Sequence, residues 1–192
     1  MALRDCPSCS FMRSYFLVIL VAAFTLRFLP SVSAGINFLF MVGIPTVLHR
    51  LSFKELGYRN YLKGALWGLG VSAAVLVPFY ALCHHFHLKL SLSAEALLFY
   101  LLVAVAEETF FRGFFYATFE NEELIPGLLS KNNLLSSVLF GVAHAFVYYN
   151  PAMFKVFFPS LVMGWLYERS GSIVAPILFH WLADVIYSFA GC

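Results

Sequence analysis

The chain has 192 residues, of which 61% are hydrophobic and 11% are charged. A soluble globular domain carries about a quarter charged residues, and a core of this size could not hide so many apolar side chains. The composition therefore excludes an ordinary soluble domain and predicts an integral membrane protein. The net charge of +2 comes from few groups, so it gives no indication of nucleic-acid binding and serves to orient the loops.

Seven apolar runs divide the chain, each near the ~20 residues that ~30 Å of hydrocarbon requires. We expect an all-α fold, a polytopic transmembrane helical bundle of about seven transmembrane helices, as a single domain over residues 1–192. The first run could instead be a signal peptide, because Val32-Ser33-Ala34 resembles a cleavage site. Six comparable runs follow it, which favours a retained helix. The runs lie near 13–29, 33–49, 64–82, 94–118, 133–149, 152–168 and 172–190.

The distribution of Lys and Arg predicts a cytoplasmic N-terminus. In that orientation the cytoplasmic side carries Arg4, Arg13, Arg50, Lys54, Arg59, Lys63, Lys131 and Arg169, and the outer side carries Arg27, Lys89 and Lys155. An odd number of crossings then places Cys192 outside. We expect the chain to lie in a bacterial or archaeal plasma membrane.

Two short motifs have structural interpretations. Cys6 and Cys9 form half of a zinc-ribbon pattern with no second half, so an unpaired N-terminal tail is the expectation. Gly64 and Gly68 form a GxxxG step in the third run, which predicts close packing against another helix.

Polar residues interrupt three of the apolar runs. Each ionised group at a helix centre costs roughly 2.5 to 3.5 kcal/mol, so it needs compensation. Glu108 and Arg112 are four residues apart, the favoured spacing for an ion pair on one helix face. Glu107 points about 100° away from that face, so the two adjacent acids are expected to have different roles. The interrupting residues are Glu107, Glu108 and Arg112 in the fourth run, His144 in the fifth, and His180 with Asp184 in the seventh.

Helix arithmetic brings these groups to one layer. At ~1.5 Å per residue from the cytoplasmic helix ends, Glu107 lies ~16 Å deep, His144 ~18 Å, His180 ~12 Å and Asp184 ~18 Å. His180 and Asp184 are four residues apart and so share a helix face. Arg112 lies nearer the cytoplasmic side, at ~9 Å. We therefore expect a polar pocket that opens to the cytoplasm.

Three motifs in this order resemble a known family. Glu107-Glu108-Thr-Phe-Phe-Arg112 matches EExxxR, Phe140-Gly-Val-Ala-His144 matches FxxxH, and His180-Trp-Leu-Ala-Asp184 matches HxxxN/D. Together they resemble the CPBP family, the intramembrane glutamic endopeptidases that include type II CAAX prenyl proteases and bacteriocin-processing enzymes. The segments 55–59 and 164–176 also look like the family, so the resemblance covers about residues 50–190.

The resemblance implies a role for each motif residue and implies no cofactor or metal. Glu107 and His144 would activate a water, and His180 with Asp184 would supply the oxyanion site. Glu108 and Arg112 would hold the fourth helix and the polarity of the pocket. Family members often have Asn in place of Asp184. Because an ionised Asp would repel an oxyanion, Asp184 must either be neutral or orient His180.

Two other functions stay open at this level. Glu107, His144, His180 and Asp184 could hold a zinc ion with an open position, as in a membrane metalloprotease, although HExxH is absent. Buried Glu and His could also serve a proton-coupled transporter or membrane scaffold, although the sequence has no inverted repeat. As partners we expect the lipid bilayer and a peptide or protein substrate, and no nucleic acid. The substrate could carry a prenylated tail, a peptide leader or a membrane-tethered C-terminal sorting tail.

Overall fold

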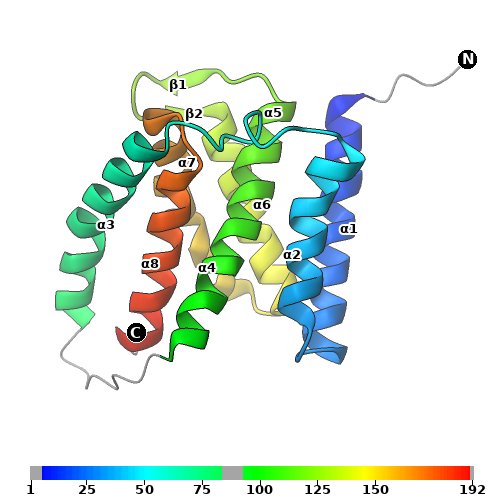
Figure 1. Ribbon diagram of the computed structural model, residues 1–192, viewed down its shortest axis with the longest axis horizontal. Coiled ribbons are helices and arrows are strands. Elements are labelled where there is room, and N and C mark those ends of the chain that lie inside the picture. The colour runs from blue at the N-terminus through cyan, green and yellow to red at the C-terminus, as the bar shows by residue number, and fades with distance from the viewer. Residues whose placement is uncertain (1–5, 84–92, 191–192) are drawn as a thin grey trace, which may run out of the picture.

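The protein is a helical bundle with one small hairpin, as the computed structural model in Figure 1 shows. Residues 6–83 and 93–190 are described, except for the side chains of residues 83, 189 and 190. Cys192, Lys89 and Arg4 lie outside these residues. The elements are α1 Pro7–Phe28, α2 Ser33–Gly43, the π-helix η1 Ile44–Leu48, α3 Tyr61–Cys83, α4 Ala94–Glu108, the π-helix η2 Thr109–Phe114, α5 Phe115–Thr118, β1 Glu123–Ile125, β2 Leu129–Ser130, α6 Lys131–Val147, the 3-10 helix η3 Pro151–Val156, α7 Phe157–Ser170 and α8 Val174–Ala190.

The predicted runs coincide with helices that alternate in direction (Figure 1). Helix α1 runs down, α2 with η1 returns, α3 runs down, α4 to α5 runs up, α6 runs down, α7 runs up and α8 runs down. The all-α expectation is therefore confirmed except for the antiparallel pair β1 and β2, whose partners are Glu123 with Ser130 and Ile125 with Leu129.

Helix length supports only part of the predicted seven crossings. Within the described ranges, the two helices both long and apolar enough to cross a membrane are Pro7–Phe28 and Tyr61–Leu82. Shorter apolar helices cover Ser33–Leu48 and Val174–Ser188. The physical reason is interruption: η2 divides the fourth run and η3 the sixth, which leaves α7 with 14 residues. That is about 21 Å of α-helix, shorter than ~30 Å of hydrocarbon.

The two ends of the bundle differ in charge. One end holds the start of α1, the loop of residues 49–60, the β1–β2 hairpin and the turn from α7 to α8 (Figure 1). We call it the basic end because it carries Arg13, Arg50, Lys54, Arg59, Lys63, Lys131 and Arg169. The opposite end, which we call the distal end, holds the α1–α2 turn and the α6–η3 junction. Its described basic residues are Arg27 and Lys155.

Polar caps fix where several helices begin. The Ser93 and Ser130 hydroxyls accept hydrogen bonds from the backbone N–H groups of Ala96 and Asn133, at the starts of α4 and α6. The Asn150 side chain caps η3 in the same way. Helix α7 ends at Gly171 in the left-handed conformation, with φ of 65°, where glycine has no steric penalty.

Close packing between α3 and α8 confirms the expectation for the GxxxG step. A Cβ added to Gly64 would lie 2.5 Å from the Ser172 hydroxyl, and one added to Gly68 would lie 2.9 Å from the carbonyl oxygen of Ala175. Both glycines therefore let the α3 backbone approach the start of α8.

Aromatic side chains fill the core between the basic end and the middle of the bundle. The Phe11 ring lies 5.0 Å from Phe114 and 5.2 Å from Phe115, and Phe111 lies 5.0 Å from Phe140 between ring centroids. Each ring in this set is at most 2% exposed. We call the set the aromatic layer: Phe11, Tyr15, Phe110, Phe111, Phe114, Phe115 and Phe140.

Candidate active site

The change from α4 to the π-helix η2 fixes the position of the two adjacent acids. Glu107 and Glu108 are the last residues of α4, and Thr109 is the first of η2. The Thr109 hydroxyl donates to the carbonyl of Val105 at 2.6 Å, so the Tyr58 hydroxyl, 2.7 Å away, is its donor. Burial raises the pKa of Tyr58, which keeps it in this protonated form. Single π turns inside helices frequently mark functional sites.

A fully buried ion pair lies directly behind the acids. Arg112 Nη1 lies 3.0 Å from Glu108 Oε1, with both side chains 0% exposed, which confirms the predicted pairing. Arg112 Nη2 donates to the carbonyl of Ser160 at 2.9 Å and to its hydroxyl at 2.5 Å. The guanidinium also lies 5.0 Å above the Phe140 ring. Arg112 is therefore held between η2, α6 and α7 and does not stand at a pocket mouth.

Three carboxylates surround the His180 ring. Its Nδ1 lies 2.8 Å from Glu108 Oε1, and its Nε2 lies 3.7 Å from Glu107 Oε2 and 3.6 Å from Asp184 Oδ2. Glu108 thus contacts a predicted site residue directly, a contact that the sequence did not indicate. The Nδ1 contact is short enough for a hydrogen bond in which the ring donates to the carboxylate.

Glu107 also faces His144 from α6. Glu107 Oε2 lies 3.9 Å from His144 Nε2, too far for a direct hydrogen bond. His144 Nδ1 lies 3.0 Å from the carbonyl of Phe140, so Nδ1 carries the hydrogen and a neutral ring presents Nε2 as an acceptor. Glu107 Oε2 is buried and has no hydrogen-bond partner among the described residues. Two acceptors separated in this way can hold one water between them.

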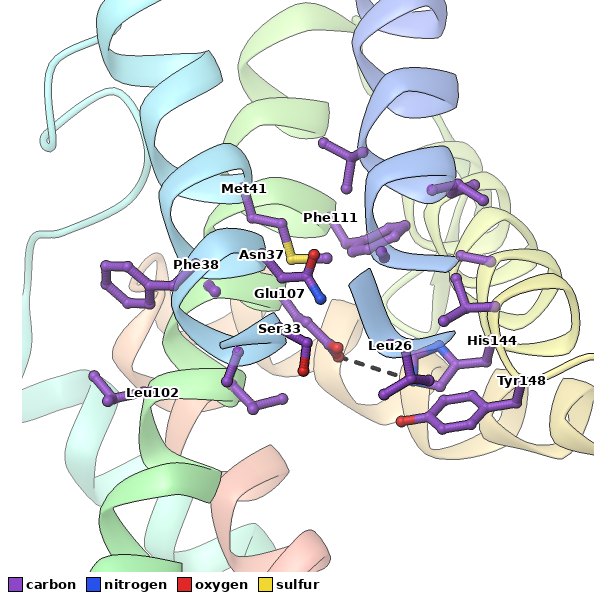
Figure 2. Close-up of a pocket in the computed structure, with 18 of the residues that line it drawn as sticks. Leu26, Ser33, Asn37, Phe38, Met41, Leu102, Glu107, Phe111, His144 and Tyr148 are labelled. Atoms are coloured by element: carbon purple, nitrogen blue, oxygen red, sulfur yellow. Dashed lines mark ion pairs between the residues drawn. The ribbon is translucent and has the colours of Figure 1, made fainter. Parts of the chain in front are cut away.

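A mostly apolar pocket of about 130 Å³ reaches this pair. Figure 2 shows Ser33 and Asn37 of α2 beside Glu107, with His144 and Tyr148 on the facing side. The Asn37 Oδ1 accepts from the Thr25 hydroxyl at 3.2 Å. The first two helices, which add nothing to the motif resemblance, therefore supply half of the wall. Ser33 and Asn37 were not predicted from the sequence as pocket residues, although both are polar residues in an apolar run.

The exposed part of the pocket lining lies on one side of Glu107 and His144. Its exposed lining residues are Leu26, Phe99, Leu102 and Tyr148. Phe99 and Leu102 precede Glu107 on α4, Tyr148 follows His144 at the end of α6, and Leu26 lies near the end of α1, so all four lie toward the distal end. The aromatic layer fills the bundle toward the basic end. Because the orientation of the bundle in the membrane is a prediction, the expected opening to the cytoplasm also stays a prediction.

Among the described residues, no group of three or more His, Cys, Asp or Glu side chains is arranged as a metal site. Cys6 and Cys9 are exposed and free. The predicted site residues do come together, with Glu107, His144, His180 and Asp184 in one cluster and Arg112 joined to it through Glu108. Such a cluster can activate a water and exchange protons with a reacting group.

Comparison with protein families identifies the chain. A family model described as type II CAAX prenyl endopeptidase Rce1-like matches residues 89–186, just over half of the chain, including all three motifs. No curated protein and no solved structure gives a significant match. The members of this family are integral membrane proteins, in agreement with the two long apolar helices. The chain therefore belongs to the Rce1-like family of type II CAAX prenyl endopeptidases and is a peptidase.

Proposed function

We propose that this peptidase is an intramembrane glutamic endopeptidase in which Glu107 and His144 activate the attacking water. The observation that carries the proposal is the 3.9 Å separation of Glu107 Oε2 and His144 Nε2 on the wall of one pocket. A water between two acceptors has its oxygen lone pairs free to attack. The substrate is a peptide or protein associated with the membrane.

The proposed hydrolysis proceeds in two steps, and Glu107 transfers the proton in both. The water oxygen attacks the scissile carbonyl carbon while Glu107 takes a water proton, and the carbonyl electron pair moves to oxygen. When the tetrahedral intermediate collapses, the C–N bond breaks and the proton held by Glu107 passes to the leaving amine. Glu107 thus serves first as base and then as acid.

His180 stabilises the oxyanion in this proposal, and its neighbours orient it. The contact of Nδ1 with Glu108 fixes the plane of the ring and leaves Nε2 directed to the side of Glu107 and Asp184. A ring protonated on both nitrogens donates from Nε2 to the developing negative charge. Asp184 Oδ2, 3.6 Å from Nε2, lies beside the oxyanion position, and Arg112 holds Glu108 in place.

For the membrane arrangement we propose that all seven runs cross the bilayer of a plasma membrane, with the N-terminus in the cytoplasm. The alternating helix directions in Figure 1 and the concentration of Lys and Arg at the basic end support this arrangement.

The proposal is tested by comparing protein termini in cells that carry the wild type or Glu107→Ala. Mass spectrometry of membrane and exported proteins should find termini that occur only with the wild type. Glu122→Ala, which changes an exposed acid on the loop before β1, is the matched control and should keep those termini. Identical termini with wild type and Glu107→Ala would contradict the proposal.

A further inference from the structure

Two cysteines lie at the start of α1, at the basic end of the bundle (Figure 1). They belong to the segment Cys6-Pro7-Ser8-Cys9, in which Cys6 is the N-cap residue and Pro7 is the first residue of the helix. Both cysteines are exposed and carry free thiols. The hydrolytic cluster uses neither of them, so this pair of nucleophilic side chains has no role in the proposed reaction.

The geometry of the helix start allows a disulfide between the two cysteines. Residues three apart on an α-helix have Cα atoms about 5 Å apart, inside the range of about 4.4 to 6.8 Å that disulfides span. Cys6 has φ of −54° and ψ of 120°, so its backbone is extended and not helical. The side chain of an N-cap residue in this conformation folds back toward the third residue of its helix, which here is Cys9. A bond between the two sulfurs therefore needs no unwinding of α1.

The surroundings of Cys6 stabilise a thiolate. Ser8 Oγ lies 2.8 Å from Cys6 Sγ and can donate its hydrogen to a negatively charged sulfur. The first backbone N–H groups of α1 have no side-chain cap, and the positive end of the helix dipole lies there. The Cys9 thiol and, after it, the Ser8 hydroxyl lower the pKa of Cys6 to about 7. A thiol whose pKa is close to the ambient pH is the best nucleophile toward a disulfide.

We infer that Cys6 and Cys9 form a redox-active dithiol that exchanges with low-molecular-weight disulfides. Two exposed thiols in a Cys-x-x-Cys segment at a helix start have the arrangement that this chemistry requires. The site is separate from the hydrolytic cluster, and the inference does not depend on the proposed function.

The exchange has two steps. The Cys6 thiolate first attacks one sulfur of the small disulfide, whose S–S bond breaks, so that a mixed disulfide forms and one small thiolate leaves. The Cys9 sulfur then loses its proton and attacks Cys6 Sγ, so that the second small thiolate leaves. The dithiol of the protein is oxidised to a disulfide, and the small disulfide is reduced to two thiols, which take up the protons released by Cys6 and Cys9.

The redox state of the full chain in glutathione buffers tests the inference. Cys83 and Cys192 are replaced with Ser, so that Cys6 and Cys9 are the remaining thiols. The protein, purified in detergent, is equilibrated with mixtures of reduced and oxidised glutathione, quenched with acid and labelled with a maleimide. Its intact mass then gives the number of free thiols. Cys9→Ala in the same background is the matched control, because it keeps Cys6 at the N-cap without a second thiol.

As the share of oxidised glutathione rises, the protein should pass from two labels to none with the loss of two hydrogen atoms. The transition should not depend on protein concentration, and Cys9→Ala should accumulate the mixed disulfide with glutathione instead. Three results would each overturn the inference: two labels at every ratio, glutathione adducts on both thiols without an internal disulfide, or disulfide-linked dimers that increase with protein concentration.

A rate measurement separates an activated pair from two passive thiols. At pH 7 iodoacetamide should alkylate Cys6 roughly threefold faster than it alkylates glutathione, because the larger thiolate fraction outweighs the lower nucleophilicity of each thiolate. Peptide mass mapping identifies the alkylated residue. A Cys6 thiol that reacts no faster than glutathione would also overturn the inference, because the helix start would then provide no activation.

Discussion

His180 Nε2 lies 3.6 Å from Asp184, and Nδ1 lies 2.8 Å from Glu108. This arrangement explains how an acid can serve beside an oxyanion. At 3.6 Å Asp184 makes no direct hydrogen bond to the ring. In the proposed site it acts as a neutral donor to the oxyanion or as an acceptor that the ring approaches, and neither role needs a negative charge. On the proposed mechanism, an amide of the same shape should therefore replace the carboxylate of Asp184.

Asp184→Asn should accordingly keep substantial activity, whereas Asp184→Leu should lose on the order of 10²-fold or more, the scale of a lost oxyanion-hole group. The measurement is the ratio of the two cleavage rates, with membrane insertion checked for both variants. If both variants are stable and both cleave at rates near zero, the negative charge of Asp184 is required. The role assigned to Asp184 would then be withdrawn.

Arg112→Met should destabilise the protein by about 3 to 5 kcal/mol, because it leaves the fully buried Glu108 carboxylate without its cationic partner. Lys54→Met, in an exposed loop, is the matched control and should stay within about 0.5 kcal/mol. Thermal unfolding in detergent measures both. A melting temperature of Arg112→Met equal to that of the control would show that the pair contributes no stability.

At the residue scale, the sequence predicted contacts between side chains on one helix but not contacts between helices. The four-residue spacing of Glu108 and Arg112 predicts their pairing because both lie on one face. The contact between Glu108 and His180 joins residues 72 positions apart, and no local pattern specifies it. Ser160 was missed for the same reason, since its partner Arg112 lies on another helix.

At the scale of the helices, two glycines of α3 allow a matched comparison, because Gly68 packs against α8 and Gly70 does not. Gly68→Ala should cost about 1 to 3 kcal/mol, because its Cβ would press on the backbone of Ala175. Gly70→Ala meets nothing within 4 Å and should be neutral or stabilising by up to about 1 kcal/mol. Unfolding midpoints in detergent compare the two, and an equal loss of stability in both would rule out close α3–α8 packing as the cause.

Hydropathy predicted where the helices lie but could not predict how they are interrupted. The apolar run of residues 94–118 contains no proline or capping signal at Thr109, yet η2 begins there with support from Tyr58 in a distant loop. Counting residues also could not predict which side of the site the phenylalanines after Glu107 fill. Packing between α1, η2 and α6 decides it.

For the molecule as a whole, the chemistry should be independent of metal ions. Strong chelators should leave the purified, detergent-solubilised enzyme active, because a Glu and His pair can activate water without a Lewis acid. The measurement is the cleavage rate before and after chelation together with the zinc content. Stoichiometric zinc, with activity lost on stripping and restored by zinc, would make the metalloprotease the better interpretation.

The central claim is that Glu107 is the base that activates water, and the most direct measurement is the cleavage rate of purified Glu107→Gln. The amide keeps the size of the side chain but cannot take a proton, so the rate should fall by about 10²- to 10⁴-fold, the usual contribution of a general base. His144→Ala should show a loss of similar scale, while both variants insert and melt as the wild type does. A Glu107→Gln enzyme that is folded and retains most of its activity would contradict the glutamate-base mechanism.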